Sequence, residues 1–268
     1  MGARLVELFQ YRELLYNLVV RDLKVRYKNS VLGVAWSVLN PLFMMLVFTV
    51  VFTVMQPSGI ARFPVFVLCA LLPWNFFSTS ITGATDCIVG NSHLIKKVYF
   101  PREVLPLSIV LSNLVNFFPA LLVLFGMMAL FRIQLTLWIL YLPLLILIQI
   151  AFSTGMALLL STVNVFYRDT KHIMEALMLA WFFVTPIFWD HTILPEKAFF
   201  LGINWPVQRL TFILNPMASL ISAYRDILYF GRSIGPDFLS RTAITALAFL
   251  VVGYWFFGRY SKVFGEEV

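Results

Sequence analysis

The chemistry-bearing residues of this chain lie outside its long apolar segments. The adjacent pair Lys96 and Lys97 belongs to a polar stretch, Asn91–Pro101, between two uncharged runs. The three histidines fall in loops or at the ends of apolar runs, and no Cys/His cluster has metal-ligand spacing. The phosphate-loop, dinucleotide, zinc-protease and nucleophile-elbow motifs are all missing. The sequence therefore predicts no metal, no cofactor and no catalytic residue on this chain.

Ionisable residues are missing from the middle of the apolar runs as well. Carboxylates at that depth are the usual sign of a proton relay or of ion coupling. Their absence argues against a proton- or sodium-driven transporter. It also argues against an intramembrane protease or transferase, which would need a nucleophile with a base. A transport function would therefore need a separate source of energy.

The stretch Asn91–Pro101 has the pattern of a short helix. Apolar residues recur at i,i+4 spacing, a capping residue precedes them, and Pro101 ends the segment. The pattern consists of Leu94 with Val98, Ile95 with Tyr99, and Asn91 or Ser92 as the cap. Two helical turns are not stable alone in water. The stretch is either a connecting loop or a docking helix for a soluble partner. Because a transporter of this kind would need a separate source of energy, we favour the docking helix.

The composition is that of an integral membrane protein. Of 268 residues, 60% are hydrophobic and 12% are charged, whereas soluble domains carry about 25% charge. Long unbroken apolar runs predict helices rather than a barrel. The net charge of +7 indicates contact with anionic lipid, not with nucleic acid. Cys69 and Cys87 should lie near opposite ends of one helix, about 27 Å apart, which excludes a disulfide between them.

We predict an all-α fold with six transmembrane helices in a single domain, residues 1–268. The expected spans are about 32–55, 63–86, 105–131, 136–163, 171–189 and 241–258. Pro41 should kink the first. The fifth is unusual because 14 uncharged residues separate Glu175 from Asp190, fewer than the roughly 20 that a span needs.

Two further segments complete the expected fold. Residues 1–30 are predicted to form an amphipathic helix in the headgroup plane, with a solvated tail as the alternative; their charges rule out a signal peptide. Residues 190–238 contain two apolar pieces, Leu194–Leu214 and Met217–Tyr229. They predict a re-entrant helical pair in the outer leaflet, with a small extracellular cap as the alternative.

The distribution of Lys and Arg sets the orientation. With six spans, most of the 20 Lys and Arg residues fall on the side of both termini, and short outer loops hold few. By the positive-inside rule, both termini are cytoplasmic. The same holds for Asn91–Pro101 and Arg168–Lys171.

Several stretches, spread over nearly the whole chain in matching order, resemble the membrane subunit of type 2 ATP-binding-cassette (ABC) exporters of bacterial cell-surface polysaccharides. They are Arg21-Asp22-Leu23-Lys24-Val25-Arg26-Tyr27 with Ser30-Val31-Leu32-Gly33 and Trp36, Leu72-Pro73-Trp74 with Phe76-Phe77, Asn91 to Arg102 with Leu105-Pro106, Asn164-Val165-Phe166-Tyr167-Arg168-Asp169, and Asn215-Pro216-Met217 with Arg225. O-antigen exporters look nearest, with teichoic acid exporters close behind.

The resemblance implies a multi-pass permease of the bacterial plasma membrane. It implies two copies of this chain, two copies of a separate ATPase that holds ATP and Mg, and a lipid-linked polysaccharide as substrate. It gives the ATPase-coupling role to Asn91, Ser92, His93, Leu94, Ile95, Lys96 and Lys97. Arg21, Asp22, Lys24, Arg26 and Tyr27 are expected in the interfacial helix, next to membrane lipid.

Aromatic residues crowd the short fifth span. Broken or short helices mark transport paths, and sugar C–H faces can lie on aromatic rings. The hypothesis for the glycan path is Trp36, Trp181, Phe182, Phe183, Phe188 and Trp189. The alternative function is an intramembrane enzyme or scaffold of lipid-linked glycan synthesis, and a neighbouring gene for an ATPase would favour the exporter.

Overall fold

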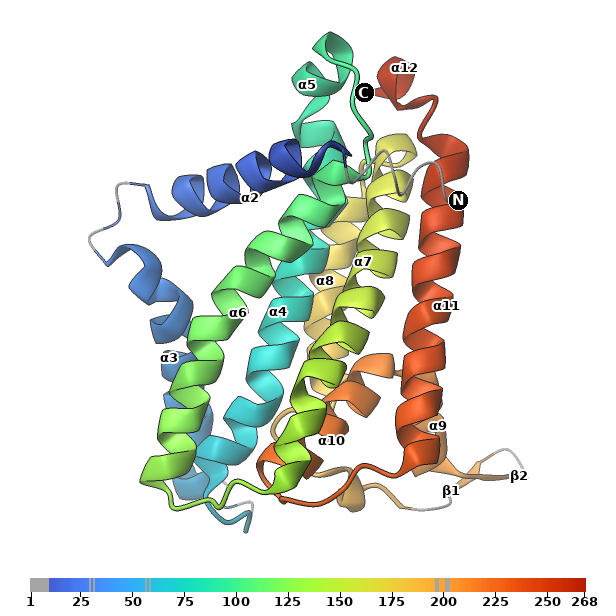
Figure 1. Cartoon of the computed structure of the whole chain (residues 1–268). Coiled ribbons are helices and arrows are strands. Elements are labelled where there is room, and N and C mark those ends of the chain that lie inside the picture. The colour runs from blue at the N-terminus through green and yellow to red at the C-terminus, as the bar shows by residue number, and fades with distance from the viewer. Residues whose placement is uncertain are drawn as a thin grey trace.

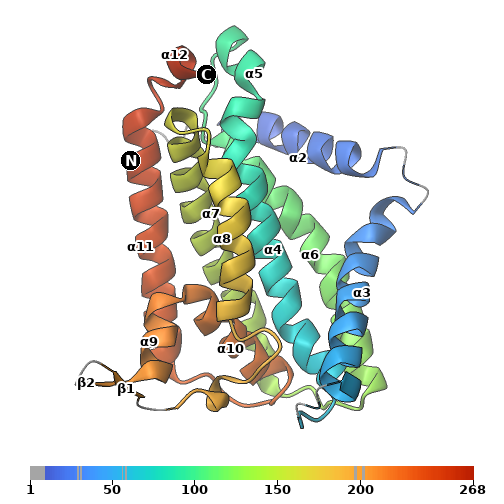
Figure 2. The same ribbon diagram turned by 180° about the vertical axis from the view of Figure 1, so that it is seen from behind.

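The computed structural model describes residues 10–28, 30, 32–55, 57, 59–195, 198–200 and 203–268. Long helices run roughly side by side, and α2 (Arg12–Tyr27) crosses one end of them (Figure 1). The turned view places α8 and α3 on the opposite face from α6 (Figure 2). The fold is α-helical except for one short two-stranded ribbon within the described residues.

Five helices of the described chain are long and apolar enough to cross a membrane. They are α3 (Trp36–Val50, continued by a π-helical turn, Val51–Met55), α4 (Phe63–Gly90), α6 (Val104–Leu130), α7 (Leu142–Phe166, preceded by a 3-10 turn, Leu137–Tyr141) and α11 (Pro236–Tyr260). They correspond to the predicted spans one to four and six. Pro41 and Pro73 lie inside their helices.

The predicted fifth span forms a shorter helix, α8 (Thr170–Val184). Its 15 residues extend about 22 Å, less than the roughly 30 Å of a bilayer core. The helix ends because Thr185 precedes Pro186 and adopts extended backbone angles. A complete span over 171–189 is therefore not confirmed, and Phe188 and Trp189 lie beyond the helix.

The helices differ in how deeply they are packed. In the most apolar stretch of α4, 78% of the residues are buried, whereas only 6% are buried in the corresponding stretch of α3. α4 is the central helix, with α6, α7, α3 and α10 (Pro216–Leu228) packed around it. α3 lies at the edge with most of its surface open to lipid or to another chain.

A glycine pair fixes α7 against α11. A Cβ atom on Gly253 would lie 2.2 Å from the carbonyl oxygen of Gly155, and one on Gly155 would lie 2.4 Å from the backbone of Phe249. Only glycine allows two helix backbones to approach so closely. α11 makes its largest contact with α7, which explains how a helix with few buried residues stays attached.

The segment between α8 and α11 only partly follows the prediction. Two helices meet here as expected: α9 (Val207–Leu214) ends before Asn215, and α10 begins at Pro216. The first apolar piece is not one helix, because it includes an antiparallel ribbon of β1 (Ala198–Phe200) and β2 (Ile203–Trp205). A 3-10 turn (His191–Ile193) precedes it. All but one residue of α10 are buried, so this helix inserts into the bundle.

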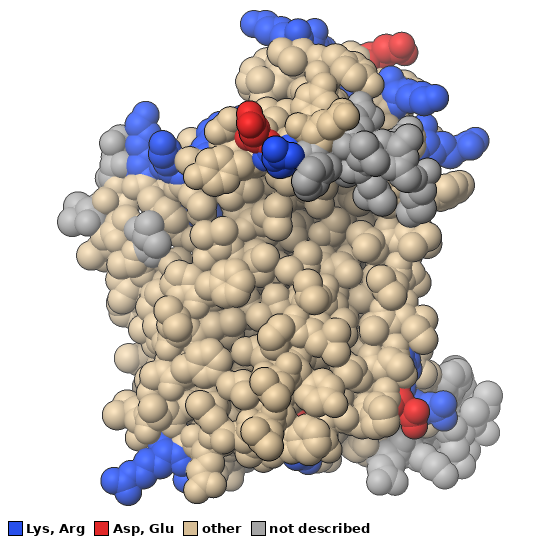
Figure 3. Space-filling model, viewed as in Figure 1, with Lys and Arg blue, Asp and Glu red and all other residues tan. Residues whose placement is uncertain are grey.

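The other end of the bundle carries three short elements. These are α2, α5 (Ser92–Lys97) and α12 (Phe264–Glu267), which Figure 1 shows at the same end. Figure 3 shows a wide band without charged residues between this end and the α9–α10 end. The positive-inside prediction makes the α5 end cytoplasmic. The predicted interfacial helix is helical from Arg12 to Tyr27, and residues 1–9 lie outside the described residues.

Candidate functional site: a polar cavity and a protruding helix

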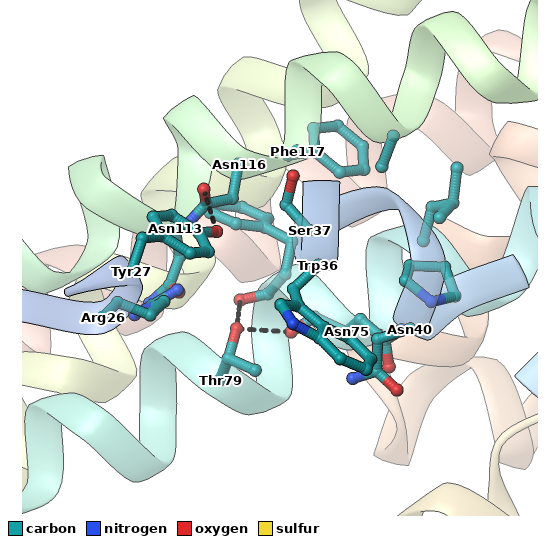
Figure 4. A pocket seen from close by; sticks show the side chains of 14 residues that line it. Arg26, Tyr27, Trp36, Ser37, Asn40, Asn75, Thr79, Asn113, Asn116 and Phe117 are labelled. Atoms are coloured by element: carbon teal, nitrogen blue, oxygen red, sulfur yellow. Dashed lines mark hydrogen bonds between the residues drawn. The ribbon is translucent and has the colours of Figure 1, made fainter. Parts of the chain in front are cut away.

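A polar cavity of about 620 Å³ lies at the α2 end, between α2, α3, α4 and α6 (Figure 4). Four of its lining residues are asparagines carried by apolar helices: Asn40 on α3, Asn75 on α4, and Asn113 and Asn116 on α6. Among the described residues that line it, Arg26 is the charged one and no carboxylate is present. The cavity therefore offers amide groups and a positive charge.

Two hydrogen bonds tie α2 to the wall of this cavity. Arg26 Nη1 donates to Asn113 Oδ1 at 2.8 Å, and the Tyr27 hydroxyl donates to Asn116 Oδ1 at 2.8 Å. Asn113 and Asn116 share one face of α6 because they are three residues apart. The last turn of α2 thus covers the cavity at a fixed position.

The cavity borders the part of α6 that carries Asn113 and Asn116, within an otherwise apolar helix. Polar side chains on an apolar helix face protein or a water-filled space, and they mark substrate paths. Trp36 is 46% exposed, and Asn40 and Thr79 are exposed as well, so the cavity is accessible from the surface.

Sequence reasoning found only part of this site. Arg26, Tyr27 and Trp36 were candidates, but for an interfacial helix and a glycan path rather than for one shared cavity. The four asparagines are neutral, so a prediction based on ionisable residues does not include them. Amides inside otherwise apolar spans were the signal that could have revealed them.

The predicted coupling helix forms α5, but its apolar face is already occupied. Ile95 is buried in a cluster with Phe100 and Phe264 of its own chain. It therefore holds α5 in place and is not exposed to a partner. The exposed residues of α5 are His93, Lys96 and Lys97, followed by Val98 and Tyr99.

The C-terminal helix α12 supports α5 from the side. α12 contacts α5, and the ring of the fully buried Phe264 lies 5.9 Å from the guanidinium of Arg102. Burial lowers the pKa of the Arg102 guanidinium below its usual value. This support explains how two helical turns remain ordered.

The aromatic residues near α8 do not share one environment. Trp181 donates from Nε1 to Asn215 Oδ1 at 2.8 Å, and Phe182 is buried in the core. Phe183 is 56% exposed. Phe188 and Trp189 are half-buried, and Phe188 stacks on Phe52 of the π-helical turn that follows α3. Of the five, only Phe183 presents most of its ring to the exterior of this chain.

A buried arginine fixes the outer end of α8. Arg225 on α10 is 3% exposed, and its Nη1 donates to the carbonyl of Pro186 at 2.6 Å and that of Trp189 at 3.1 Å. It also donates to the carbonyls of Ile187 and Phe66, and its guanidinium lies 3.6 Å from the Phe66 ring. The turn after α8 is therefore bound to α10.

The described part of the chain contains no group of three His, Cys, Asp or Glu residues that could hold a metal ion. Cys69 and Cys87 are both free and buried. Long apolar helices thus surround a polar cavity, and a supported polar helix protrudes at one end, as a membrane transporter subunit requires.

Comparison with known proteins gives the family. Residues 13–229 match the ABC-2 type transporter family, and the chain belongs to it. The chain is 36% identical over 268 residues to the O-antigen export system permease protein RfbA of Myxococcus xanthus, covering 98% of both proteins. It is 31% identical over 255 residues to the RfbA permease of Klebsiella pneumoniae, covering 95% of this chain and 94% of that one. The chain is thus a permease subunit of an ABC transporter.

Proposed function

We propose that two copies of this chain, with two copies of a separate ATPase, export a lipid-linked surface glycan of the O-antigen class across the bacterial plasma membrane. The names of the relatives support the substrate class. Both termini are cytoplasmic, ATP and Mg bind to the partner ATPase, and this chain contributes no cofactor. The membrane-facing helices contact lipid, and nucleic acid has no role.

The geometry of α5 is the observation that supports a separate ATPase as the source of energy. Its apolar side packs against its own chain, whereas Lys96 and Lys97 are exposed at the end of the bundle where α2 lies. Val98 and Tyr99 add exposed apolar surface beside them, at 58% and 83%. A rigid, protruding element with charged and aromatic groups suits docking to a soluble partner.

The exposed side of α8 supports a second copy of the chain. Leu177, Phe183 and Val184 are exposed on this helix, which is too short to face lipid across the whole bilayer core. A short helix of this kind must end against protein or a water-filled space. We place the glycan route along this side of α8, between the two copies.

Charge reversal on α5 tests the proposed function in cells. Lys96→Glu with Lys97→Glu should remove the ATPase from the purified complex and stop export, and lipid-linked glycan should accumulate on the inner side. The control pair is Lys24→Glu with Lys28→Glu, because both residues are exposed at the α2 end. A scaffold of glycan synthesis would instead lose the glycan itself. Retention of both the ATPase and export by the α5 variant contradicts the proposal.

A further inference from the structure

We propose that the cavity between α2, α3, α4 and α6 binds the phosphorylated first sugar of a lipid-linked glycan at the cytoplasmic side of the membrane. This inference rests on the proposed function and adds a recognition site to it. It assigns a ligand class to the amide cluster and to Arg26, for which the transport scheme alone gives no role.

The cavity wall has the chemistry that sugars require. Sugar hydroxyls both donate and accept hydrogen bonds, and each side-chain amide offers a carbonyl oxygen and two N–H donors. Asn40 and Asn75 supply such amides from two helices, and Thr79 adds a hydroxyl oxygen whose proton is donated to the backbone carbonyl of Asn75. Trp36 adds a partly exposed ring on which the C–H face of a sugar can pack.

One cavity group has an unused donor. The Asn116 side chain accepts from Tyr27 through Oδ1, but its Nδ2 is buried and has no hydrogen-bond partner in the described part of the chain. A buried polar atom left unpaired costs about 1–3 kcal/mol of stability. Such groups are uncommon, and because this atom is buried, a ligand in the cavity completes its hydrogen bonding only after the Asn116 amide turns toward the cavity.

The charge of the cavity indicates an anionic ligand. Arg26 is exposed, and its Nη1 donates to Asn113 while the guanidinium presents further N–H groups. No carboxylate stands among the described lining residues to neutralise it. Guanidinium groups bind phosphate oxygens through paired, charge-assisted hydrogen bonds. Arg26 also lies at the end of α2, at the level expected for phosphate headgroups.

The surroundings of the cavity fit a ligand that is anchored by a lipid tail. A volume of about 620 Å³ holds a phosphate with a sugar or two, not a polymer. From the cavity mouth at Trp36 and Asn40, an exposed stripe follows α3 at helical spacing. The stripe continues with Phe43, Val47 and Val50, all of them exposed. An isoprenoid chain could therefore lie along α3 while its head occupies the cavity.

A binding experiment on the ATPase-bound complex in phosphatidylcholine nanodiscs, without ATP, tests this assignment. The first probe is a fluorescent isoprenyl diphosphate that carries one N-acetylglucosamine, and the second is the same diphosphate without the sugar. The variants are Arg26→Gln and the pair Asn40→Leu with Asn75→Leu. The matched controls are Lys24→Gln and Asn17→Leu, because both residues are exposed on α2 and do not line the cavity.

Arg26→Gln should weaken both probes by about tenfold or more, since a hydrogen bond to a charged group is worth about 1.5–3 kcal/mol. The asparagine pair should weaken the sugar-bearing probe at least as strongly while leaving the bare diphosphate nearly unchanged. The control variants should bind both probes like the parent protein.

Three results would overturn the assignment. The cavity variants could bind like the controls, the asparagine pair could weaken both probes equally, or phosphatidylglycerol in the nanodisc could displace both probes, which would make this a phospholipid site. Export by the unaltered protein in cells tests the proposed function separately. If that export is present while the cavity variants bind like the controls, only the cavity assignment fails.

Discussion

Lys171 Nζ lies 3.0 Å from Asp86 Oδ2, so an ion pair joins the first turn of α8 to the last turns of α4. The hydrogen bond to Asp86 raises the pKa of Lys171 above its ordinary value. The backbone N–H of Lys171 also donates to Asn164 Oδ1 at 3.2 Å. Asp86 precedes α5 by only a few residues. The pair thus lies between α5, which we propose as the docking helix, and α8, along which we place the glycan.

We predict that this ion pair couples ATP hydrolysis to transport. Asp86→Lys and Lys171→Asp should each lower the amount of glycan exported per ATP, and the double exchange should restore it. Both side chains are about 40% exposed, so the pair stabilises the fold by about 1 kcal/mol or less, and assembly should persist. The measurement is the amount of glycan exported per ATP hydrolysed, at equal amounts of assembled complex. A double variant as poor as the single ones would show that this pairing does not matter.

The contact between α7 and α11 predicts that even a methyl side chain is too large at Gly253. Gly253→Ala places a methyl group 2.2 Å from a backbone oxygen and forces the helices apart. Overpacking of this kind costs about 1–3 kcal/mol. The melting temperature of the assembled complex should therefore be lower than that of the parent protein.

The matched control for that substitution is Gly126→Ala in α6, where nothing lies within 4 Å of the added atom. Replacing a helical glycine by alanine at such a site stabilises the helix by about 0.5–1 kcal/mol. Equal melting temperatures for the two alanine variants would show that the glycine contact is not tight.

The sequence was sufficient for the large features of the fold and insufficient for the site. Uninterrupted apolar runs identify α3, α4, α6, α7 and α11, because a bilayer imposes length and composition on each helix alone. The end of α8 depends on Thr185 and Pro186, which stop the helix at Val184, whereas the spacing of charged residues alone places the end of the span near 189. Ile95 was assigned to a partner because the position of Phe264, far along the chain, cannot be derived from local periodicity. The cavity likewise depends on how four helices meet.

The orientation of the chain is open to a chemical test. Gly235→Cys should react with an impermeant thiol reagent applied to intact cells, because the residue is exposed at the outer end of α11. His93→Cys should react only after the membrane is opened. The native Cys69 and Cys87 are buried and should not react with the reagent. Labelling of His93→Cys from outside would reverse the orientation.

The structure separates two aromatic residues that the sequence grouped together. Trp181→Ala removes the hydrogen bond to Asn215 and the edge contact with Phe77, so the complex should unfold at lower temperature. Phe183→Ala removes a ring that is 56% exposed and meets Phe182 and Phe188 only edge-on, so it should lower the melting temperature less than Trp181→Ala does. If the glycan passes along α8, Phe183→Ala should nevertheless lower export per ATP. Unchanged export in this variant would remove Phe183 from the path.

Reconstitution tests the central claim most directly. The purified permease, its ATPase, or both are placed in liposomes with a fluorescent isoprenyl-diphosphate-linked oligosaccharide, and glycan that has crossed is cleaved by an enzyme trapped inside. ATP is supplied outside, where the ATPase faces. We predict cleavage that requires ATP, Mg and both chains together, and none with either chain alone. Crossing that needs neither ATP nor the ATPase, or no crossing with the complete complex while ATP is hydrolysed, would contradict the account.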